Sequence, residues 1–313
     1  MPADREPIPP TGDTAVIGER RSNLLSIVLL RDASFWRRSR RRRVGRLLLA
    51  VVYLYVALLG VLLALENRLA FPGSLAFAWQ DRQPGPEVVD VELSTADGNR
   101  IHAWFAAPPG WRRERGAVLY SHGNGGNLSW RTGGVVRWRD ATGRAVLIYD
   151  YPGYGKSTGS PHEASCYAAA EAAYAWLVDE AKVPPEEIIL LGSSMGGAMA
   201  TELATRHRCR MLVLVNSFTS FPDMAQQRFP WLPARWLVRN QFDNLGKLPE
   251  VGCPVFITHG EADQVVPYAQ GRRLFDAASE PKRFLSLPGH PHSHPRTPAF
   301  FAAVNAFLKE TAK

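Results

Sequence analysis

The sequence is poor in cysteine. Its 313 residues include three, Cys166, Cys209 and Cys253. No two of them form a C-x-x-C pair and their number is odd, so the chain has neither the disulfide framework of a small secreted domain nor the ligand spacing of a zinc site. The simplest interpretation is that all three are small buried apolar residues, and one bridge remains possible in an oxidising compartment.

Outside one short stretch, the sequence also lacks net charge. The chain carries +8 at pH 7, and seven arginines between positions 37 and 46 account for nearly all of it. A nucleic-acid-binding domain spreads its basic groups over a folded face. The local concentration of arginine therefore argues against a nucleic-acid partner.

Long apolar runs are lacking too, with one exception at Leu47–Leu65. This run holds 19 residues and no charge. At about 1.5 Å per residue it just spans a hydrocarbon core of about 30 Å. We predict a single transmembrane anchor at residues 47–65. A cleaved signal peptide is the alternative, but the run is longer than a typical signal core and no A-x-A site follows it.

The arginine-rich flank sets the expected topology. Positive residues beside a span remain on the cytoplasmic side, and they also contact anionic lipid headgroups. We therefore expect residues 1–46 to be a disordered, basic cytoplasmic tail. Residues 66–313 would form an extracytoplasmic catalytic domain.

From about residue 84 onward, short apolar runs alternate with helical patterns. Two runs flank Asp97-Gly98, a strong hairpin signal. The later runs are continuous apolar strands separated by helices, which indicates a mostly parallel central sheet with helices on both faces. The expected strands are 88–93, 100–105, 117–120, 145–149, 188–191, 211–215, 255–258 and 283–287, and the expected helices include 163–180, 195–206, 268–278 and 298–308.

A long irregular segment follows the sixth expected strand. Residues 218–248 contain three prolines and several aromatic residues. The segment is too long for a plain connection, so we predict a short insertion that acts as a lid or cap.

Ser194 is the candidate nucleophile. Gly192-Ser193-Ser194-Met195-Gly196 matches G-x-S-x-G, follows the apolar strand IILL and precedes a helix. This is the strand–turn–helix context of a nucleophile elbow, in which flanking glycines avoid steric collision. The helix dipole would also favour negative charge that develops at Ser194.

A serine hydroxyl needs a base, and the base needs an orienting acid. Asp263 lies in a loop just after the strand at 255–258, where such an acid belongs. Glu261 and Asp223 are competing candidates for the acid.

Three histidines compete for the role of base. His290, His292 and His294 follow the last expected strand, and position alone slightly favours the middle one. The H-x-H-x-H pattern could also bind a transition metal, but no carboxylate or cysteine lies near it in the sequence. We therefore predict no metal site.

Two backbone N–H groups are expected to bind the oxyanion. One belongs to Met195, the residue after the nucleophile. The other belongs to Asn124 in the glycine-rich loop 122–127, which follows the third strand. The glycines of this loop let the backbone approach a substrate carbonyl closely.

Taken together, several segments resemble one family. The segments are HGNGGN, DYPGYGKSTGSPHE, GSSMGG, NSFTSFPDMA, FDNLGKL and HGEADQVVP. They resemble the membrane-anchored α/β-hydrolase-domain (ABHD-type) serine hydrolases, a group related to serine aminopeptidases and lysophospholipase-like enzymes. The resemblance runs from about Leu69 to the C-terminus and implies an α/β-hydrolase fold behind one N-terminal transmembrane helix.

The resemblance also selects one histidine. The family pattern is similar to P-G-x-x-H-N-D, and alignment on Pro288-Gly289 places the catalytic histidine at His292. The chain departs from the pattern afterwards, since Ser293-His294 replaces Asn-Asp.

These features predict a serine hydrolase that works through Ser194, His292 and Asp263. The expected substrate is an acyl-containing small molecule or lipid with an ester, thioester or amide bond, and a lipid-like ester is favoured. No cofactor is expected. The alternatives are a serine aminopeptidase and a catalytically inactive membrane-bound binding or scaffold protein, since a fold alone does not establish activity.

Overall fold

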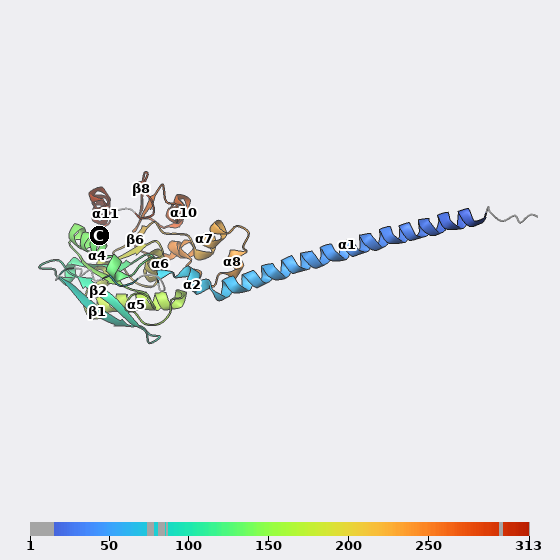
Figure 1. The fold of residues 1–313 in the computed structure, drawn as a ribbon. Coiled ribbons are helices and arrows are strands. Elements are labelled where there is room, and N and C mark those ends of the chain that lie inside the picture. Colours follow the sequence, from blue (N-terminus) through green and yellow to red (C-terminus); the bar gives the residue numbers. More distant parts are fainter. Residues whose placement is uncertain (1–15, 74–77, 81–84, 86, 294–296, 313) are drawn as a thin grey trace, which may run out of the picture. The chain divides into compact units, whose positions relative to one another are not determined.

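The computed structural model describes residues 16–73, 78–80, 85, 87–293 and 297–312, with side chains of the first helix from residue 39 onward. The chain divides into two compact units, Met1–Leu62 and Leu63–Lys313. This boundary lies close to the predicted one between the anchor and the catalytic domain. Figure 1 shows the fold of both units.

The described part of the first unit is one long helix, α1 (Val16–Ala64), of 49 residues. Within it, Ser39–Ala64 is long and apolar enough to cross a membrane, and an 18-residue window of this stretch has a mean hydropathy of 2.8. The large apolar side chains of this stretch face outward, as shown by Leu54, which is 71% exposed. The predicted span at residues 47–65 falls almost entirely within this helix.

The expectation of disorder over residues 1–46 does not hold for residues 16–46. They are helical in the structure, and residues 1–15 lie outside the described residues. No proline interrupts the chain between positions 16 and 64, and arginine and leucine are good helix formers. A helix that begins in the apolar span can therefore extend backwards through the basic stretch.

The second unit is built on an eight-stranded sheet with the order β1-β2-β4-β3-β5-β6-β7-β8. β1 pairs antiparallel with β2, and β2 pairs antiparallel with β4. All later pairings, from β3 with β4 to β7 with β8, are parallel. The strands are β1 (Val88–Ser94), β2 (Arg100–Ala106), β3 (Ala117–Ser121), β4 (Ala145–Tyr149), β5 (Ile188–Ser193), β6 (Met211–Val215), β7 (Val255–Gly260) and β8 (Lys282–Leu287).

Helices cover both faces of this sheet (Figure 1). The described helices of this unit are α2 (Glu66–Ala70), α4 (Thr132–Thr142), α5 (Glu163–Asp179), α6 (Gly196–Arg206), α7 (Phe221–Arg228), α8 (Ala234–Leu237), α9 (Asn244–Lys247), α10 (Tyr268–Ala277) and α11 (Pro298–Glu310). Short 3-10 helices lie at η1 (Arg113–Arg115), η2 (Leu128–Trp130), η3 (Pro185–Glu187) and η4 (Leu248–Glu250).

Successive strand residues enter two different cores. In β3, Leu119 packs in the core that includes α5 and α6, whereas Val118 and Tyr120 pack in the core that includes α4 and α11. The second core contains the fully buried Trp138, whose ring meets that of Phe301 edge-on at 5.2 Å. Burial on both sides explains why the strands read as continuous apolar runs, and it confirms the predicted α/β architecture.

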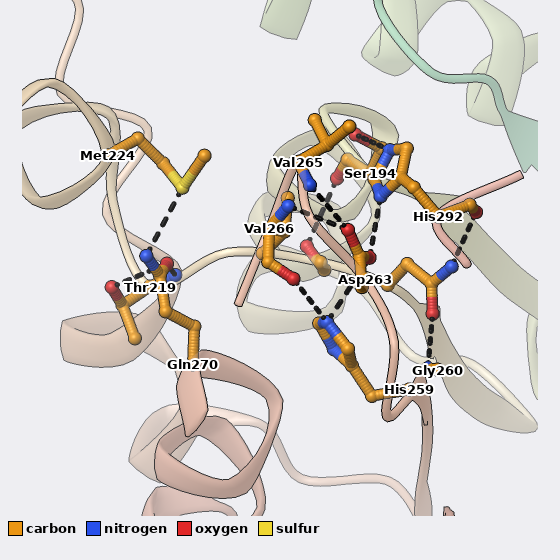
Figure 2. Close-up of polar contacts among 12 residues, drawn as sticks. Ser194, Thr219, Met224, His259, Gly260, Asp263, Val265, Val266, Gln270 and His292 are labelled. Atoms are coloured by element: carbon orange, nitrogen blue, oxygen red, sulfur yellow. Dashed lines mark hydrogen bonds and ion pairs between the residues drawn. The ribbon is translucent and has the colours of Figure 1, made fainter. Parts of the chain in front are cut away.

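The predicted insertion at residues 218–248 contains α7, α8 and α9. Gln270 of α10 ties it to the rest of the unit (Figure 2). Its side-chain oxygen accepts from the N–H of Thr219 at 3.0 Å, and its amide nitrogen lies 3.2 Å from Met224 Sδ. The insertion is therefore hydrogen-bonded to a helix that packs on the sheet.

Candidate active site

Ser194 occupies a sharp turn between β5 and α6. Its φ angle of 53° lies in the left-handed region, which a side chain rarely adopts. The turn is held by hydrogen bonds from the Ser194 N–H to the Val215 carbonyl at 2.9 Å and from Ser217 Oγ to the Ser194 carbonyl at 3.1 Å. The serine is therefore held in a strained conformation by its neighbours.

Glycines make this turn possible. A Cβ atom on Gly196 would lie 1.9 Å from the Ser121 carbonyl oxygen, and one on Gly192 would lie 2.4 Å from the Gly197 Cα. Real side chains do not tolerate such distances from backbone atoms. The G-x-S-x-G pattern therefore reflects a steric requirement of the elbow.

One imidazole ring bridges Ser194 and Asp263 (Figure 2). His292 Nε2 lies 3.1 Å from Ser194 Oγ, and its Nδ1 lies 2.7 Å from Asp263 Oδ2. An ionised carboxylate only accepts hydrogen bonds, so the proton of neutral His292 is on Nδ1. Nε2 is then free to accept the serine proton, as a general base must.

The Asp263 carboxylate is buried and accepts hydrogen bonds from several protein groups (Figure 2). Its Oδ1 accepts from the N–H groups of Val265 and Val266, both at 2.8 Å. His259 Nε2 lies 3.4 Å from Oδ2 and donates to the Val266 carbonyl at 2.8 Å. Burial raises the pKa of Asp263, but hydrogen bonds from His259, His292 and Val266 outweigh burial and hold the pKa below its usual value.

Asn216 fixes the loop that carries His292. Its side-chain nitrogen donates to the His292 carbonyl at 2.6 Å, and its side-chain oxygen accepts from the Gly260 N–H at 3.0 Å. Asn216 itself has a φ of 49°, a conformation that asparagine tolerates better than most residues. Neither Asn216 nor His259 was predicted from the sequence to belong to the site. The one available signal for Asn216 is a polar residue directly after the apolar strand β6.

The two segments that carry the expected oxyanion donors both lie next to the serine. Met195 caps α6, and the glycine-rich loop passes so close that a Cβ on Gly123 would lie 3.4 Å from the Ser194 Cβ. Among the residues that the structure describes, no acceptor pairs with the N–H of Met195 or of Asn124. Both donors are thus available to a substrate oxygen.

The competing acids lie in other networks. Ser286 Oγ donates to the Glu261 carboxylate at 2.6 Å. Asp223 pairs with Arg273 at 3.1 Å and with Arg235 at 3.3 Å. Neither carboxylate is bonded to His292.

Of the two competing histidines, the structure describes His290. His290 Nδ1 lies 2.9 Å from the Pro288 carbonyl oxygen. His294 lies outside the described residues. Of the described histidines, His292 is the one hydrogen-bonded to both Ser194 and Asp263.

Comparison with known proteins assigns the family. The model of the α/β-hydrolase fold family matches residues 116–238. The uncharacterized protein Rv2307c of Mycobacterium tuberculosis is 36% identical over 226 residues, which cover 71% of this chain and 80% of that protein. Protein bem46 of Schizosaccharomyces pombe is 30% identical over 269 residues, which cover 80% of this chain and 88% of that protein.

A solved structure supports the same fold. The esterase Pf2001 of Pyrococcus furiosus superposes with a TM-score of 0.60 at 20% identity, covering 75% of this chain and 95% of that one. At this identity the likeness speaks for the fold alone. The chain belongs to the α/β-hydrolase family, as the sequence resemblance predicts, and it is a hydrolase.

Proposed function

We propose that this hydrolase is a membrane-anchored serine hydrolase that cleaves an acyl ester through a covalent intermediate on Ser194. The observation that carries the proposal is the His292 ring, which lies within hydrogen-bond distance of both Ser194 Oγ and Asp263 Oδ2. A base that is itself oriented by a buried carboxylate is what a serine nucleophile requires.

In the proposed reaction, Ser194 Oγ attacks the carbonyl carbon while its proton passes to His292 Nε2. The N–H groups of Met195 and Asn124 bind the oxyanion of the tetrahedral intermediate. His292 then gives its proton to the leaving alcohol, and the acyl enzyme remains. Water then gives a proton to His292 Nε2 and attacks the acyl carbon. As the second tetrahedral intermediate collapses, His292 returns the proton to Ser194 Oγ, which releases the acid and the free serine.

A lipid-like substrate is favoured by the surface of the insertion. Three of its aromatic side chains are exposed, Phe229 by 44%, Trp231 by 54% and Trp236 by 89%. Exposed aromatic rings are typical of surfaces that contact membrane interfaces or apolar ligands. Together with the apolar helix Ser39–Ala64, they favour a substrate drawn from the membrane.

Labelling with a fluorophosphonate probe tests the nucleophile. Wild type should label, Ser194→Ala should not, and the surface variant Ser279→Ala should label like wild type. Ester hydrolysis by Ser194→Ala should fall by roughly 10⁵-fold or more. Equal labelling of Ser194→Ala and wild type would show that the reactive group lies elsewhere.

Esters of graded acyl length test the substrate class. The kcat/KM for p-nitrophenyl esters should rise from acetyl toward medium and long chains, since each buried CH₂ contributes about 0.8 kcal/mol to binding. A maximum at acetyl would contradict the lipid-like assignment and leave the nucleophile assignment intact.

A further inference from the structure

The segment just after the apolar helix, Glu66–Gly73, is bound into the catalytic unit. The Glu66 carboxylate is 8% exposed and accepts four hydrogen bonds of 2.8–2.9 Å, two each from Arg239 and Asn240. Burial raises the pKa of Glu66, but these hydrogen bonds outweigh it and lower the pKa. The segment therefore starts at an ionic contact with the insertion, in which Glu66 is buried and the Arg239 side chain is largely exposed.

The middle of the segment is packed equally firmly. Phe71 is fully buried, and its ring centroid lies 6.1 Å from that of Phe242 and 6.3 Å from that of Phe221. Burial of an aromatic ring in an apolar environment stabilises the packed arrangement. The segment is thus a structural part of the domain and not a free linker.

Its far end contacts the loop of the expected oxyanion donor. The Ala70 carbonyl accepts a hydrogen bond from Asn124 Nδ2, while Asn124 Oδ1 accepts from Tyr154 Oη. Gly73 packs so tightly that a Cβ there would lie 2.5 Å from the Asn124 carbonyl oxygen and 2.1 Å from Tyr154 Cε1. Both the nitrogen and the oxygen of the Asn124 side-chain amide are therefore hydrogen-bonded, and one of the two partners belongs to Glu66–Gly73.

We infer that Glu66–Gly73 positions the Asn124 N–H for oxyanion binding, so that the membrane-proximal segment is part of the catalytic scaffold. This inference rests on the proposed function. An oxyanion donor must lie about 2.7–3.1 Å from the developing charge, and small displacements weaken it. Asn124 is secured through its side chain, which leaves its backbone N–H for the substrate. Ala70 and Gly73 are positioning residues in this arrangement.

Gly73→Ala tests the inference, because the added methyl group must displace the Asn124 carbonyl or the Tyr154 ring. We expect kcat to fall by about 10- to 100-fold with KM nearly unchanged, since the oxyanion contact forms only in the transition state. Affinity for a trifluoromethyl ketone, which forms an oxyanion, should fall in parallel. Gly252→Ala is the matched control, because nothing lies within 4 Å of its added Cβ.

A double-mutant cycle separates positioning from general damage. Asn124→Ala keeps the backbone N–H but removes the side-chain contacts, so it should also lower kcat. Adding Gly73→Ala to the Asn124→Ala variant should then lower kcat much less than adding it to wild type, because both changes act on the position of the Asn124 loop. Additive losses, or a Gly73→Ala variant with wild-type kcat, would overturn the inference. Absence of Ser194-dependent activity in wild type would instead overturn the proposed function.

A second inference comes from an independent observation, the pair Cys209 and Cys253. These residues precede the adjacent parallel strands β6 and β7, and their Sγ atoms lie 2.8 Å apart. Carbon atoms in van der Waals contact lie about 3.5–4.0 Å apart, so these two larger sulfur atoms are unusually close. Both side chains are partly exposed and line a surface cavity of about 670 Å³, so a small reagent can reach them.

We propose that Cys209 and Cys253 form a disulfide when the protein meets a thiol oxidant such as glutathione disulfide. One thiolate attacks the oxidant and releases one glutathione; the second attacks the mixed disulfide and releases another. The two protein thiols are oxidised to one disulfide, and glutathione disulfide is reduced to two glutathiones. The bridge would join the ends of a chain segment that contains β6 and the whole insertion.

Counting thiols in the full chain tests this second proposal. After equilibration with glutathione disulfide and denaturation, a maleimide reagent should add to one cysteine, and after reduction to all three. Cys253→Ser should not acquire the bridge, and Cys166→Ser should acquire it as wild type does. Three reactive thiols in the oxidised wild type would overturn the proposal.

Discussion

At the scale of single residues, the positions of the His290 and His292 rings predict that their removal has very different effects on kcat. His292→Ala removes the one described ring that contacts both Ser194 Oγ and Asp263 Oδ2, and kcat should fall by roughly 10⁵-fold. His290→Ala removes a ring whose Nδ1 faces the Pro288 carbonyl and should keep kcat within about tenfold of wild type. Steady-state hydrolysis of one ester measures both, and high activity in His292→Ala would contradict the assignment.

Asp263 makes the stability of the domain depend on pH. Its folded-state pKa is lowered, so it contributes stability above its unfolded pKa of about 4, and that stability is lost as the pH falls toward the folded pKa. Between pH 6 and pH 3, the free energy of unfolding of the wild type should therefore decrease by roughly 1 kcal/mol more than that of Asp263→Asn. Urea unfolding at several pH values measures the difference. Parallel losses in the two proteins would contradict this prediction.

Some residues of the site could be predicted from sequence and others could not. Ser194 and Asp263 each follow an apolar strand in a local pattern, so their place at the carboxyl edge of the sheet follows from the chain near them. His292 needed the family resemblance, because three histidines share its stretch. Asn216 acts through contacts with His292 and Gly260, which lie far from it in sequence, and no local pattern encodes such contacts. His259 contacts Asp263 and Val266 in the loop that follows it, but the loop conformation that brings these groups together cannot be read from the residue types.

At the scale of elements, two helical glycines should respond to alanine in opposite ways. A Cβ on Gly197 in α6 would lie 2.0 Å from Ser217 Oγ, whereas one on Gly134 in α4 would meet nothing closer than 3.8 Å. Gly197→Ala should destabilise the fold by about 1–3 kcal/mol through overpacking. Gly134→Ala should stabilise it by about 0.5–1 kcal/mol, since alanine favours helices. Urea unfolding measures both, and a shared sign would contradict the steric argument.

The strands were easier to predict than the helices. All eight strand positions are confirmed, and each lies within two residues of its prediction at either end. Strands β3 to β7 are buried on both faces and therefore form continuous apolar runs, whereas β1 is largely exposed and was located by the turn that joins it to β2. Helix α4 was not predicted. Its sequence contains Gly133-Gly134 and little apolar periodicity, and its helical form depends on the packing of Val135 and Trp138 in a core with α11.

At the scale of the whole molecule, the charge flanking the apolar helix predicts an orientation. Seven arginines between positions 37 and 46 precede the apolar stretch, so they should remain cytoplasmic and the catalytic unit should be outside. Protease added to intact cells or spheroplasts should degrade the catalytic unit. Protection in intact cells, with cleavage after permeabilisation, would place the unit in the cytoplasm instead.

The separate N-terminal apolar helix could be predicted from composition, because an uncharged apolar run of 19 residues is typical of a transmembrane helix. The helical state of residues 16–46 did not follow. Proline, glycine and charge in the first 22 residues suggested a disordered tail, and the short apolar run at residues 22–30 is only a weak indication of a helix. Helix propagation from an adjacent stable helix, however, needs no further nucleus.

The buried contact of Glu66 has a consequence for how substrate is found. The apolar helix ends at Ala64, and Glu66 is already fixed in the catalytic unit, so the chain between them has almost no slack. In the proposed anchored state, the enzyme and a lipid-borne ester would share one membrane, and the effective concentration of the ester would be set by its mole fraction among the lipids. Turnover of such an ester would then follow surface dilution: adding inert lipid would slow the enzyme even at a constant bulk concentration of substrate.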